Sequence, residues 1–454
     1  MTALVWLLVK AQSPLRMLVI AACSALACTL LLVAVAISNL PLEPDERLFA
    51  LVADYGTRGG VVLALVLLVA PVLMLLYQAV LLGSAVRNRR MAILRIIGAT
   101  PQQVRLLGGA ELGLPGLVGA LGGVVLYLSV QVLLGGRKPP SPGQFIFASP
   151  LPGLIPADVG PTWRQSCLVL MAVVGIIVAM GWRVTRNVVR RPIAPTRRQG
   201  PAHPRPWGLV PLAVSIGGYL IALTHPETGT MTLLVLIALA AAGLMLLGPW
   251  TAYRAGTHAA RRATTVEVLL GSRRLVTDPW AAGRAAAPVG MIGLVTGGTA
   301  CIIALLIVRG SLELYYIASV VLVLVLLLTS LTIVALGLAV HAVETLSSNR
   351  RSTAVLAASG VRARVLEGSL RAESQTVALP TAVTGLVIGA ASVLGLAEQL
   401  PDSEHPLFGL TAIVATLVAL GATVLLLRIA TTLAVRLGRP WLTRAMDPQA
   451  LRTG

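Results

Sequence analysis

Two glutamates, Glu111 and Glu373, each stand where a polar stretch gives way to a long apolar one. An ionisable side chain at a membrane boundary is costly unless it is paired or lies at a helix N-terminus, where the helix dipole favours negative charge. We expect both glutamates to lie at helix starts and to bond a neighbouring arginine, such as Arg105 or Arg371. A role as structural anchors and a role in transmitting motion both stay open. Proton relay is disfavoured, since no second acid or histidine lies deep in the same span.

The remaining reactive side chains form no catalytic pattern. There is no HExxH motif, no Ser/His/Asp or Cys/His arrangement, and no GxxxxGK[ST] loop that would hold the phosphates of a nucleotide. We therefore expect no enzyme activity, no metal site and no cofactor bound by this chain. The four cysteines lie in apolar segments without metal-ligand spacing, and the histidines lie at membrane edges or in loops. These residues are Cys23, Cys28, Cys167, Cys301, His203, His225, His258, His341 and His405.

The composition is that of a membrane protein. Of 454 residues, 56% are hydrophobic and only 12% are charged, with a mean hydropathy of +0.87, whereas soluble domains carry about 25% charge. A helix needs about 20 mostly apolar residues to cross the hydrocarbon core. We predict an all-α polytopic membrane protein of about ten transmembrane helices. The candidate spans are residues 15–39, 61–83, 108–134, 165–181, 208–223, 231–249, 286–308, 315–340, 374–397 and 407–427.

The net charge of +19 is divided between the two sides of the predicted membrane. With the N-terminus in the cytoplasm, the inside segments hold 30 of the 36 lysines and arginines, and the outside loops hold 10 of the 17 acidic residues. This bias predicts that both termini are cytoplasmic, and it disfavours nucleic acid as a partner. The basic residues then face anionic lipid head groups. Thirty-four arginines against two lysines are typical of a high-GC bacterium, so we expect the plasma (inner) membrane of a bacterium.

An internal repeat relates the two halves of the chain at an offset of 262 residues, without a gap. Each glutamate follows a glycine by thirteen residues, and opens a stretch with a proline and a small-xxx-small pair. Those pairs, Gly119 with Gly123 and Gly385 with Gly389, let helix backbones approach closely in lipid. The aligned positions are Arg89 with Arg351, Ala92 with Ala354, Leu94 with Leu356, Gly98 with Gly360, Glu111 with Glu373, and Gly123 with Gly385.

The repeat predicts four helices, a central pair and four more helices. We divide the chain into a first module at residues 1–181, a basic, proline-rich cytoplasmic linker at 182–206, a central helix pair at 207–250 and a second module at 251–454. The prolines and arginines of the linker exclude a membrane span there. The outer loop of residues 136–164 is expected to be either a semi-ordered lid or a disordered connection.

The segment before Glu111 has the pattern of a short amphipathic cytoplasmic helix. From Arg87 to Arg105 an apolar stripe of Met91, Leu94, Ile97 and Val104 runs beside arginines. Gly98 followed by Pro101 is expected to end the helix, because glycine accepts the left-handed cap and proline cannot continue it. The alternative to a coupling role is a solvated loop helix that faces lipid. The second copy favours this alternative more than the first copy does.

The first copy of the repeat resembles the signature of FtsX-like permeases, the membrane subunits of MacB-type (type VII) ABC transporters. The resemblance lies in its basic residues, followed by "AILRIIGAT" and then by a glutamate at the next helix. The second copy, "STAVLAASGVRAR", is degraded but keeps the spacing. The helix plan resembles the ten-helix branch of that family, in which one chain carries both modules. The resemblance implies that these segments contact an ATPase. The residues it assigns to ATPase coupling are Arg87, Arg90, Met91, Leu94, Arg95, Gly98, Arg350, Arg351, Leu356 and Gly360.

This resemblance implies a permease subunit driven by a separate ATPase, in two copies per permease, which binds ATP and magnesium. The chain departs from better-known members because it has no large extracytoplasmic domain. We expect it to move an amphiphile such as a lipid, a hydrophobic peptide or an antibiotic, in the direction of export. A non-transporting mechanotransmission subunit is the alternative, and a secondary transporter is disfavoured because the spans hold almost no buried charge.

Overall fold

The computed structural model describes most of the chain, and what it describes is almost wholly helical. The described residues are 14–41, 55–81, 91, 93–136, 155–156, 159–190, 203–225, 230–308, 328–329, 331–343, 345–346, 350–397 and 407–445. Within them the only strands are β1 (Gly135–Gly136) and β2 (Ile155–Pro156), a two-residue parallel pair. The prediction of an all-α polytopic membrane protein is therefore confirmed.

Eight described helices are long and apolar enough to cross a membrane. They coincide with eight of the ten predicted spans. A shorter apolar helix, Leu209–Ala222, matches the fifth prediction, and Leu331–Val343 overlaps the end of the eighth. Residues 315–327 of that eighth span lie outside the described part of the chain.

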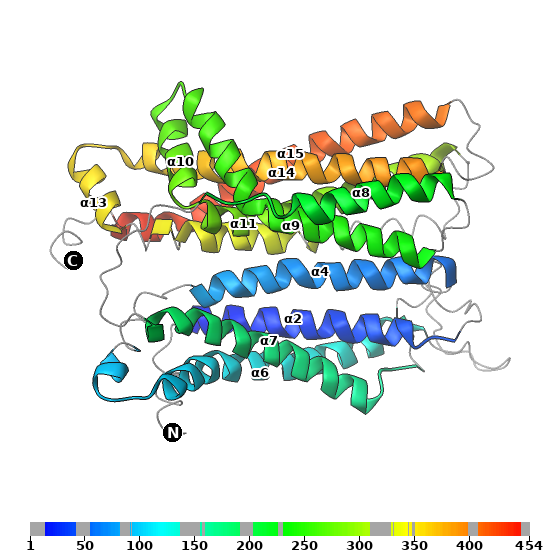
Figure 1. Cartoon of the computed structure of the whole chain (residues 1–454), viewed down its shortest axis with the longest axis horizontal. Helices are drawn as coiled ribbons and strands as arrows, with labels where there is room; N and C mark the ends of the chain where they lie inside the picture. The colour runs from blue at the N-terminus through cyan, green and yellow to red at the C-terminus, as the bar shows by residue number, and fades with distance from the viewer. Residues whose placement is uncertain are drawn as a thin grey trace. The chain divides into compact units, whose positions relative to one another are not determined.

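The chain divides into two compact units, unit 1 (Met1–Thr196) and unit 2 (Arg197–Gly454). In unit 1 the long helices run in alternating directions across the view, so that consecutive helices are antiparallel (Figure 1). They are α2 (Pro14–Ser38), α4 (Tyr55–Leu81), α6 (Pro101–Leu134) and α7 (Trp163–Arg190).

Small residues bring α2 and α6 into backbone contact. A Cβ at Gly119 would collide with the carbonyl oxygen of Ala21, and one at Gly123 would lie 2.5 Å from that of Ala25. Thr29 uses the close approach, because its hydroxyl donates to the Gly123 carbonyl at 2.9 Å. Lipid supplies no hydrophobic force between helices, so packing of this kind holds such a bundle together.

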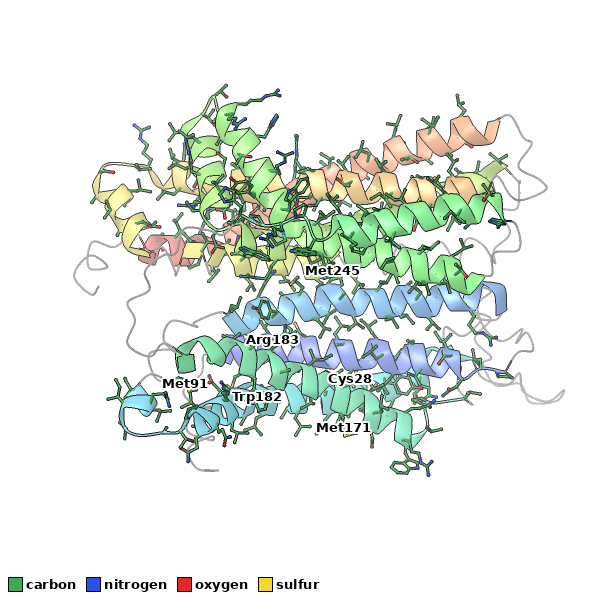
Figure 2. The ribbon with its side chains drawn as sticks, viewed as in Figure 1. Cys28, Met91, Met171, Trp182, Arg183 and Met245 are labelled. Atoms are coloured by element: carbon green, nitrogen blue, oxygen red, sulfur yellow. The ribbon has the colours of Figure 1, made fainter. Side chains whose placement is uncertain are left out.

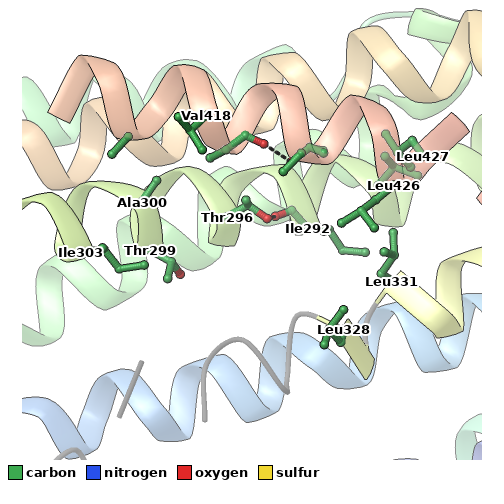
Figure 3. Close-up of a pocket in the computed structure, with 15 residues that line it drawn as sticks. Ile292, Thr296, Thr299, Ala300, Ile303, Leu328, Leu331, Val418, Leu426 and Leu427 are labelled. Atoms are coloured by element: carbon green, nitrogen blue, oxygen red, sulfur yellow. Dashed lines mark hydrogen bonds between the residues drawn. The ribbon is translucent and has the colours of Figure 1, made fainter. Parts of the chain in front are cut away.

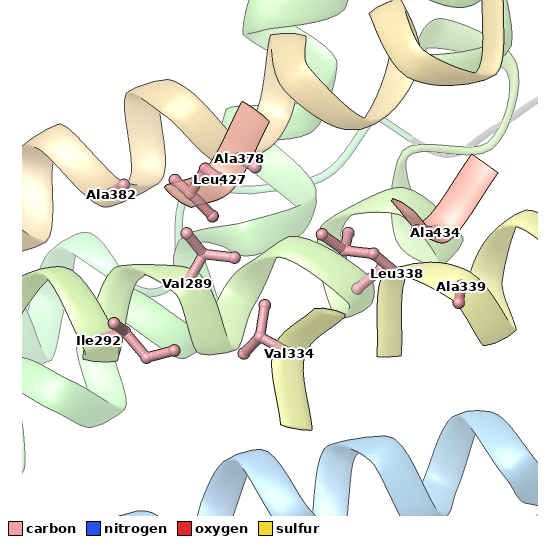
Figure 4. Close-up of a cluster of buried hydrophobic side chains, with 10 residues drawn as sticks. Val289, Ile292, Val334, Leu338, Ala339, Ala378, Ala382, Leu427 and Ala434 are labelled. Atoms are coloured by element: carbon pink, nitrogen blue, oxygen red, sulfur yellow. The ribbon is translucent and has the colours of Figure 1, made fainter. Parts of the chain in front are cut away.

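Unit 2 contains the second set of long helices and two short helices, α10 and α13. Its elements are α8 (Leu209–Thr224), α9 (Thr230–Arg261), α10 (Val266–Thr277), α11 (Pro279–Val308), α13 (Arg350–Ala358), α14 (Ala363–Ala397) and α15 (Leu407–Ala445). A hydrophobic cluster joins α11, α14, α15 and residues 331–343, with Val289, Val334, Leu338 and Leu427 almost fully buried in it (Figure 4).

The glycine pair of the second copy makes the equivalent contact in unit 2. Cβ atoms at Gly385 and Gly389 would collide with the carbonyl oxygens of Gly290 and Leu294 on α11. Each pair thus presses its helix against the helix that opens its own repeat copy, α2 in unit 1 and α11 in unit 2.

Several helices are longer than their predicted spans. α6 begins at Pro101 and α14 at Ala363, seven and eleven residues before the predicted starts, and α9 continues to Arg261. α7 continues to Arg190, so residues 182–190 of the predicted linker are helical. Hydropathy detects only the part of a helix that lies in hydrocarbon, whereas backbone hydrogen bonding continues through polar turns beyond it.

Candidate coupling site

The residues before α6 form a compact turn that we call the first connector, residues 91 and 93–100. Met91 is fully buried against Val104 of α6, and Leu94 and Ala99 pack on this pair. Three of the four residues in the predicted stripe therefore fix the connector to the start of α6.

A glycine cap ends the helical part of the first connector. Gly98 has a φ of +105°, its N–H donates to the Arg95 carbonyl at 3.1 Å, and the Ala99 N–H donates to the Leu94 carbonyl at 3.0 Å. These two bonds make up a Schellman motif, and the apolar residues at its two ends, Leu94 and Ala99, both pack on Met91 and Val104. The prediction that Gly98 ends this helix is confirmed.

A capping box starts α6 immediately after that turn. The Gln103 N–H donates to the Thr100 hydroxyl at 3.3 Å, and the Thr100 N–H donates to Gln103 Oε1 at 2.9 Å, with Pro101 at the first helical position. The Schellman motif and the capping box leave almost no free torsion between the connector and α6. The connector and the start of α6 are therefore joined by local hydrogen bonds on both sides of Ala99.

The second connector, Arg350–Arg362, repeats the glycine cap at the predicted offset. Gly360 has a φ of +89°, its N–H donates to Ala357 at 3.0 Å, and the Val361 N–H donates to Leu356 at 3.1 Å. Leu356 and Val361 pack on a buried cluster that includes Leu366. Arg362 stands where the first copy has Thr100, so the capping box is absent from the second connector.

The apolar side chains that the first connector turns outward were only partly expected. Ile97, assigned to the packed stripe, is 77% exposed, and Ile93 and Ile96 are 47% and 73% exposed. This corrects the stripe: the helix ends at Gly98, so Ile97 has no facing turn of helix to cover it. The excess of isoleucine in "AILRIIGAT" is the signal that could have identified this outward face. At the matching positions the second connector exposes Val355, Ala358 and Ser359, a less apolar face.

Of the arginines predicted to take part in coupling, only Arg95 has a side chain that the structure describes. The Arg95 guanidinium donates to the Ala99 carbonyl at 3.5 Å, within its own connector. Arg87 and Arg90 lie outside the described residues, and Arg350 and Arg351 belong to α13 with side chains that are not described.

Replacement of Gly98 by alanine tests the cap. We expect a loss of about 1 kcal/mol in the free energy of unfolding, because alanine at positive φ is strained although the space is open. Gly175→Ala on α7 is the control: that glycine is helical and also has open space, so alanine there should leave stability unchanged or raise it. Thermal unfolding of the purified chain measures both, and equal losses at the two positions would contradict the cap.

The buried glutamate of unit 1 ties three helices together. Glu111 is 3% exposed and its Oε1 lies 3.6 Å from the Arg16 guanidinium of α2. Arg16 also donates to the Val80 carbonyl near the end of α4, at 3.2 Å. α6 is thus fastened to α2 and α4 near the end that carries the connector.

The buried glutamate of unit 2 has a different set of partners at the same repeat position. Glu373 is 5% exposed, and lies 3.9 Å from Arg274 of α10 and 3.5 Å from His341. α10 reaches α14 because Gly271 packs on the Ser369 carbonyl, where a Cβ would be 2.6 Å away. α10 was not predicted as a helix, although Thr265 caps it and Glu267 favours its N-terminus.

Both glutamates correct the predicted placement at a helix start. Glu111 lies ten residues after Pro101 of α6, and Glu373 ten residues after Ala363 of α14. The helix dipole has faded at that depth, so ion pairs stabilise these carboxylates instead. The partners come from other helices, and not from Arg105 or Arg371 as we expected.

Unit 2 also contains an apolar cavity of about 350 Å³ between α11, α15 and Leu328 and Leu331 (Figure 3). Three threonines line it, but each hydroxyl donates to a carbonyl of its own helix: Thr296 to Ile292, Thr299 to Val295 and Thr423 to Ala419. The cavity therefore offers hydrocarbon and no free polar group at these positions.

A protein-family model matches part of the chain. Residues 60–193 match the family model described as FtsX-like permease C-terminal. This stretch, less than half of the chain, is similar to an FtsX-like permease domain. The domain includes the first connector, Glu111, α6 and α7, and permeases of this type are membrane subunits that work with ABC ATPases. The eight described helices that are long and apolar enough to cross a membrane make the chain a multi-pass membrane protein. No curated protein and no solved structure matches it.

Proposed function

We propose that this chain is the permease subunit of an ABC transporter in which two copies of a separate ATPase dock on the two connectors and drive export of an amphiphile. The chain lies in a bacterial plasma membrane with both termini in the cytoplasm. The observation that carries the proposal is the repeated connector: the same glycine cap, at the same offset, joined to a long membrane helix with a buried ion pair.

The outward isoleucines of the first connector support docking of a protein. Ile93, Ile96 and Ile97 lie within five residues of one another and expose apolar surface on a segment outside the membrane spans. Neighbouring exposed apolar side chains of this kind mark interaction sites. The second connector binds a second ATPase more weakly, because Val355, Ala358 and Ser359 present less apolar surface.

The joints beyond the connectors support transmission of force. In unit 1, a push on the connector reaches α6 through the Schellman motif and capping box, and reaches α2 and α4 through Arg16 and Glu111. In unit 2, α14 is coupled to α10 and to residues 331–343 through Glu373. ATP-driven closure of two ATPase subunits would displace both long helices together.

The cavity in unit 2 supports an amphiphilic substrate. Its volume of about 350 Å³ and its satisfied threonines suit an alkyl chain or an apolar peptide side chain. Among the described residues of its wall none is charged, so an inorganic ion or a sugar would gain no partner there.

The test is co-purification of the chain with its candidate ATPase and measurement of the subunit ratio by native mass spectrometry. Wild type should bind two ATPase copies, and Ile96→Asp with Ile97→Asp should bind one. Addition of Val355→Asp should leave none. Two buried isoleucines contribute at least about 3 kcal/mol, so the first site should weaken by at least about a hundredfold.

Val266→Asp with Leu269→Asp is the matched control, since these two side chains on α10 are 62% and 40% exposed but lie outside both connectors. The control should keep the ratio of two. If the connector variants also keep it, or if no ATPase binds wild type, the proposed coupling is wrong.

A further inference from the structure

A second cavity, of about 270 Å³, lies between α6 and α7 of unit 1 and combines two arginines with a tryptophan. Its wall is formed by Arg105, Ala179, Trp182 and Arg183. Figure 2 labels Trp182 and Arg183 on α7, at the end of the unit where Met91 of the first connector also lies. Arg105 directly follows Val104, the residue on which Met91 packs.

The two tryptophans of α7 place this cavity at the depth of lipid head groups. Trp163 and Trp182 are 72% and 49% exposed at opposite ends of the apolar part of the helix. Nineteen residues of helix separate them, a rise of about 28 Å, which is close to the hydrocarbon thickness of about 30 Å. Tryptophans favour both interfaces of a bilayer, so Trp182 and the arginine beside it lie at the interface.

Within the described part of the chain, the positive charge of the cavity has no internal counterpart. Among the described residues neither Arg105 nor Arg183 has a carboxylate within ion-pair distance, and Nε of Arg105 is buried without a hydrogen-bond partner. Two guanidinium groups beside one cavity repel each other, and a buried donor without a partner is costly. An anion in the cavity would relieve both effects.

The equivalent position in unit 2 supplies that anion from within the chain. The repeat offset aligns Arg105 with Glu367. Both Glu367 oxygens accept hydrogen bonds from Arg439 of α15, each at 3.0 Å. The same junction between the last two helices of a module is therefore neutralised by a carboxylate in unit 2 and by nothing described in unit 1.

We infer that the cavity between α6 and α7 binds the phosphate of an anionic phospholipid from the cytoplasmic leaflet. Arg105 and Arg183 hold the phosphate, and the acyl chains follow exposed apolar residues of α7 such as Ile176 and Met171. A lipid is favoured over a free anion because the site opens at the interface beside lipid-facing helix surface. The inference rests on the cytoplasmic orientation of this end, and depends on neither the ATPase nor the substrate.

The test uses the full chain in neutral detergent, titrated with phosphatidylglycerol or phosphatidylcholine, with bound lipid read by native mass spectrometry and stability by thermal unfolding. Wild type should bind phosphatidylglycerol and be stabilised by it. Loss of each arginine should weaken that binding about fivefold, so Arg105→Gln with Arg183→Gln should remove most of the preference. Arg262→Gln with Arg273→Gln, two exposed arginines of unit 2, should change nothing.

Arg105→Glu is a second variant that separates binding from folding. It recreates the carboxylate of unit 2 opposite Arg183, so it should abolish the stabilisation by phosphatidylglycerol while keeping the melting temperature of lipid-bound wild type. Equal stabilisation by inorganic phosphate would overturn the inference in favour of a free-anion site. An unchanged lipid preference in the double variant Arg105→Gln with Arg183→Gln would overturn it too. So would binding of phosphatidylglycerol that occurs only after an ATPase is added.

Discussion

Gly123→Leu is expected to separate α6 from α2 and to destabilise unit 1 by about 3 kcal/mol or more. The added side chain would meet the carbonyl oxygen of Ala25 and the Cβ of Cys28, at 2.5 and 2.8 Å from its first atom. A backbone carbonyl cannot turn aside as a flexible side chain can, so the helices must move apart. The hydrogen bond from Thr29 to the Gly123 carbonyl would be lost with them. Thermal unfolding in detergent or nanodiscs measures the loss.

Gly122→Leu is the matched control for this change. Gly122 is the preceding residue of the same helix, but a Cβ there meets nothing within 4 Å. The helix propensity gained is the same in both variants, and leucine at position 122 would face lipid. We expect Gly122→Leu to be neutral or stabilising by up to about 1 kcal/mol. Similar melting temperatures for the two variants would show that α2 and α6 do not pack through Gly123.

Arg16→Met should destabilise unit 1 by about 3–5 kcal/mol, because it removes the positive charge that lies 3.6 Å from the buried Glu111 carboxylate. Both side chains are less than a tenth exposed, so water cannot replace the lost partner. The same change also removes the hydrogen bond to Val80 and releases the end of α4. We expect a lower melting temperature, and an ATPase rate that no longer responds to the permease if the proposed coupling holds.

Arg16→Met combined with Glu111→Leu should recover most of that loss, since an apolar pair of similar volume needs no counter-charge. Arg439→Met provides the control at an ion pair of which the arginine is 58% exposed, and there we expect about 1 kcal/mol or less. Failure of the double variant to recover stability would mean that Arg16 acts through packing or through Val80, and not through Glu111.

The local features of the connectors could be predicted because neighbouring residues determine them. Gly98 at positive φ, followed by Pro101 at the first position of α6, follows from the conformations open to glycine and proline. The small-xxx-small pair predicted that Gly123 would lie close to another helix, because such pairs pack helices in lipid. The sequence did not predict that this helix would be α2.

The partners of buried charges could not be predicted in the same way. Glu111 pairs with Arg16, far away in the chain, although Arg105 is nearer in sequence. An α-helix carries residues six apart to different faces, so Arg105 turns toward α7 while Glu111 turns toward α2. In unit 2 the same face of α14 meets α10, a helix that hydropathy does not detect because it is amphipathic and short.

The sequence by itself determined that this chain crosses a membrane many times, that its halves repeat, and that each copy has a capped turn before a long helix. These properties depend on composition, hydrophobic length and local backbone preferences, all of which act over a few to about 25 residues. Only the tertiary structure decided which charges pair and which isoleucines face outward. It also decided that Glu367 pairs with Arg439, whereas Arg105, at the equivalent position of unit 1, meets no acid among the described residues. Those outcomes depend on which helix faces come together, and packing between distant segments sets that.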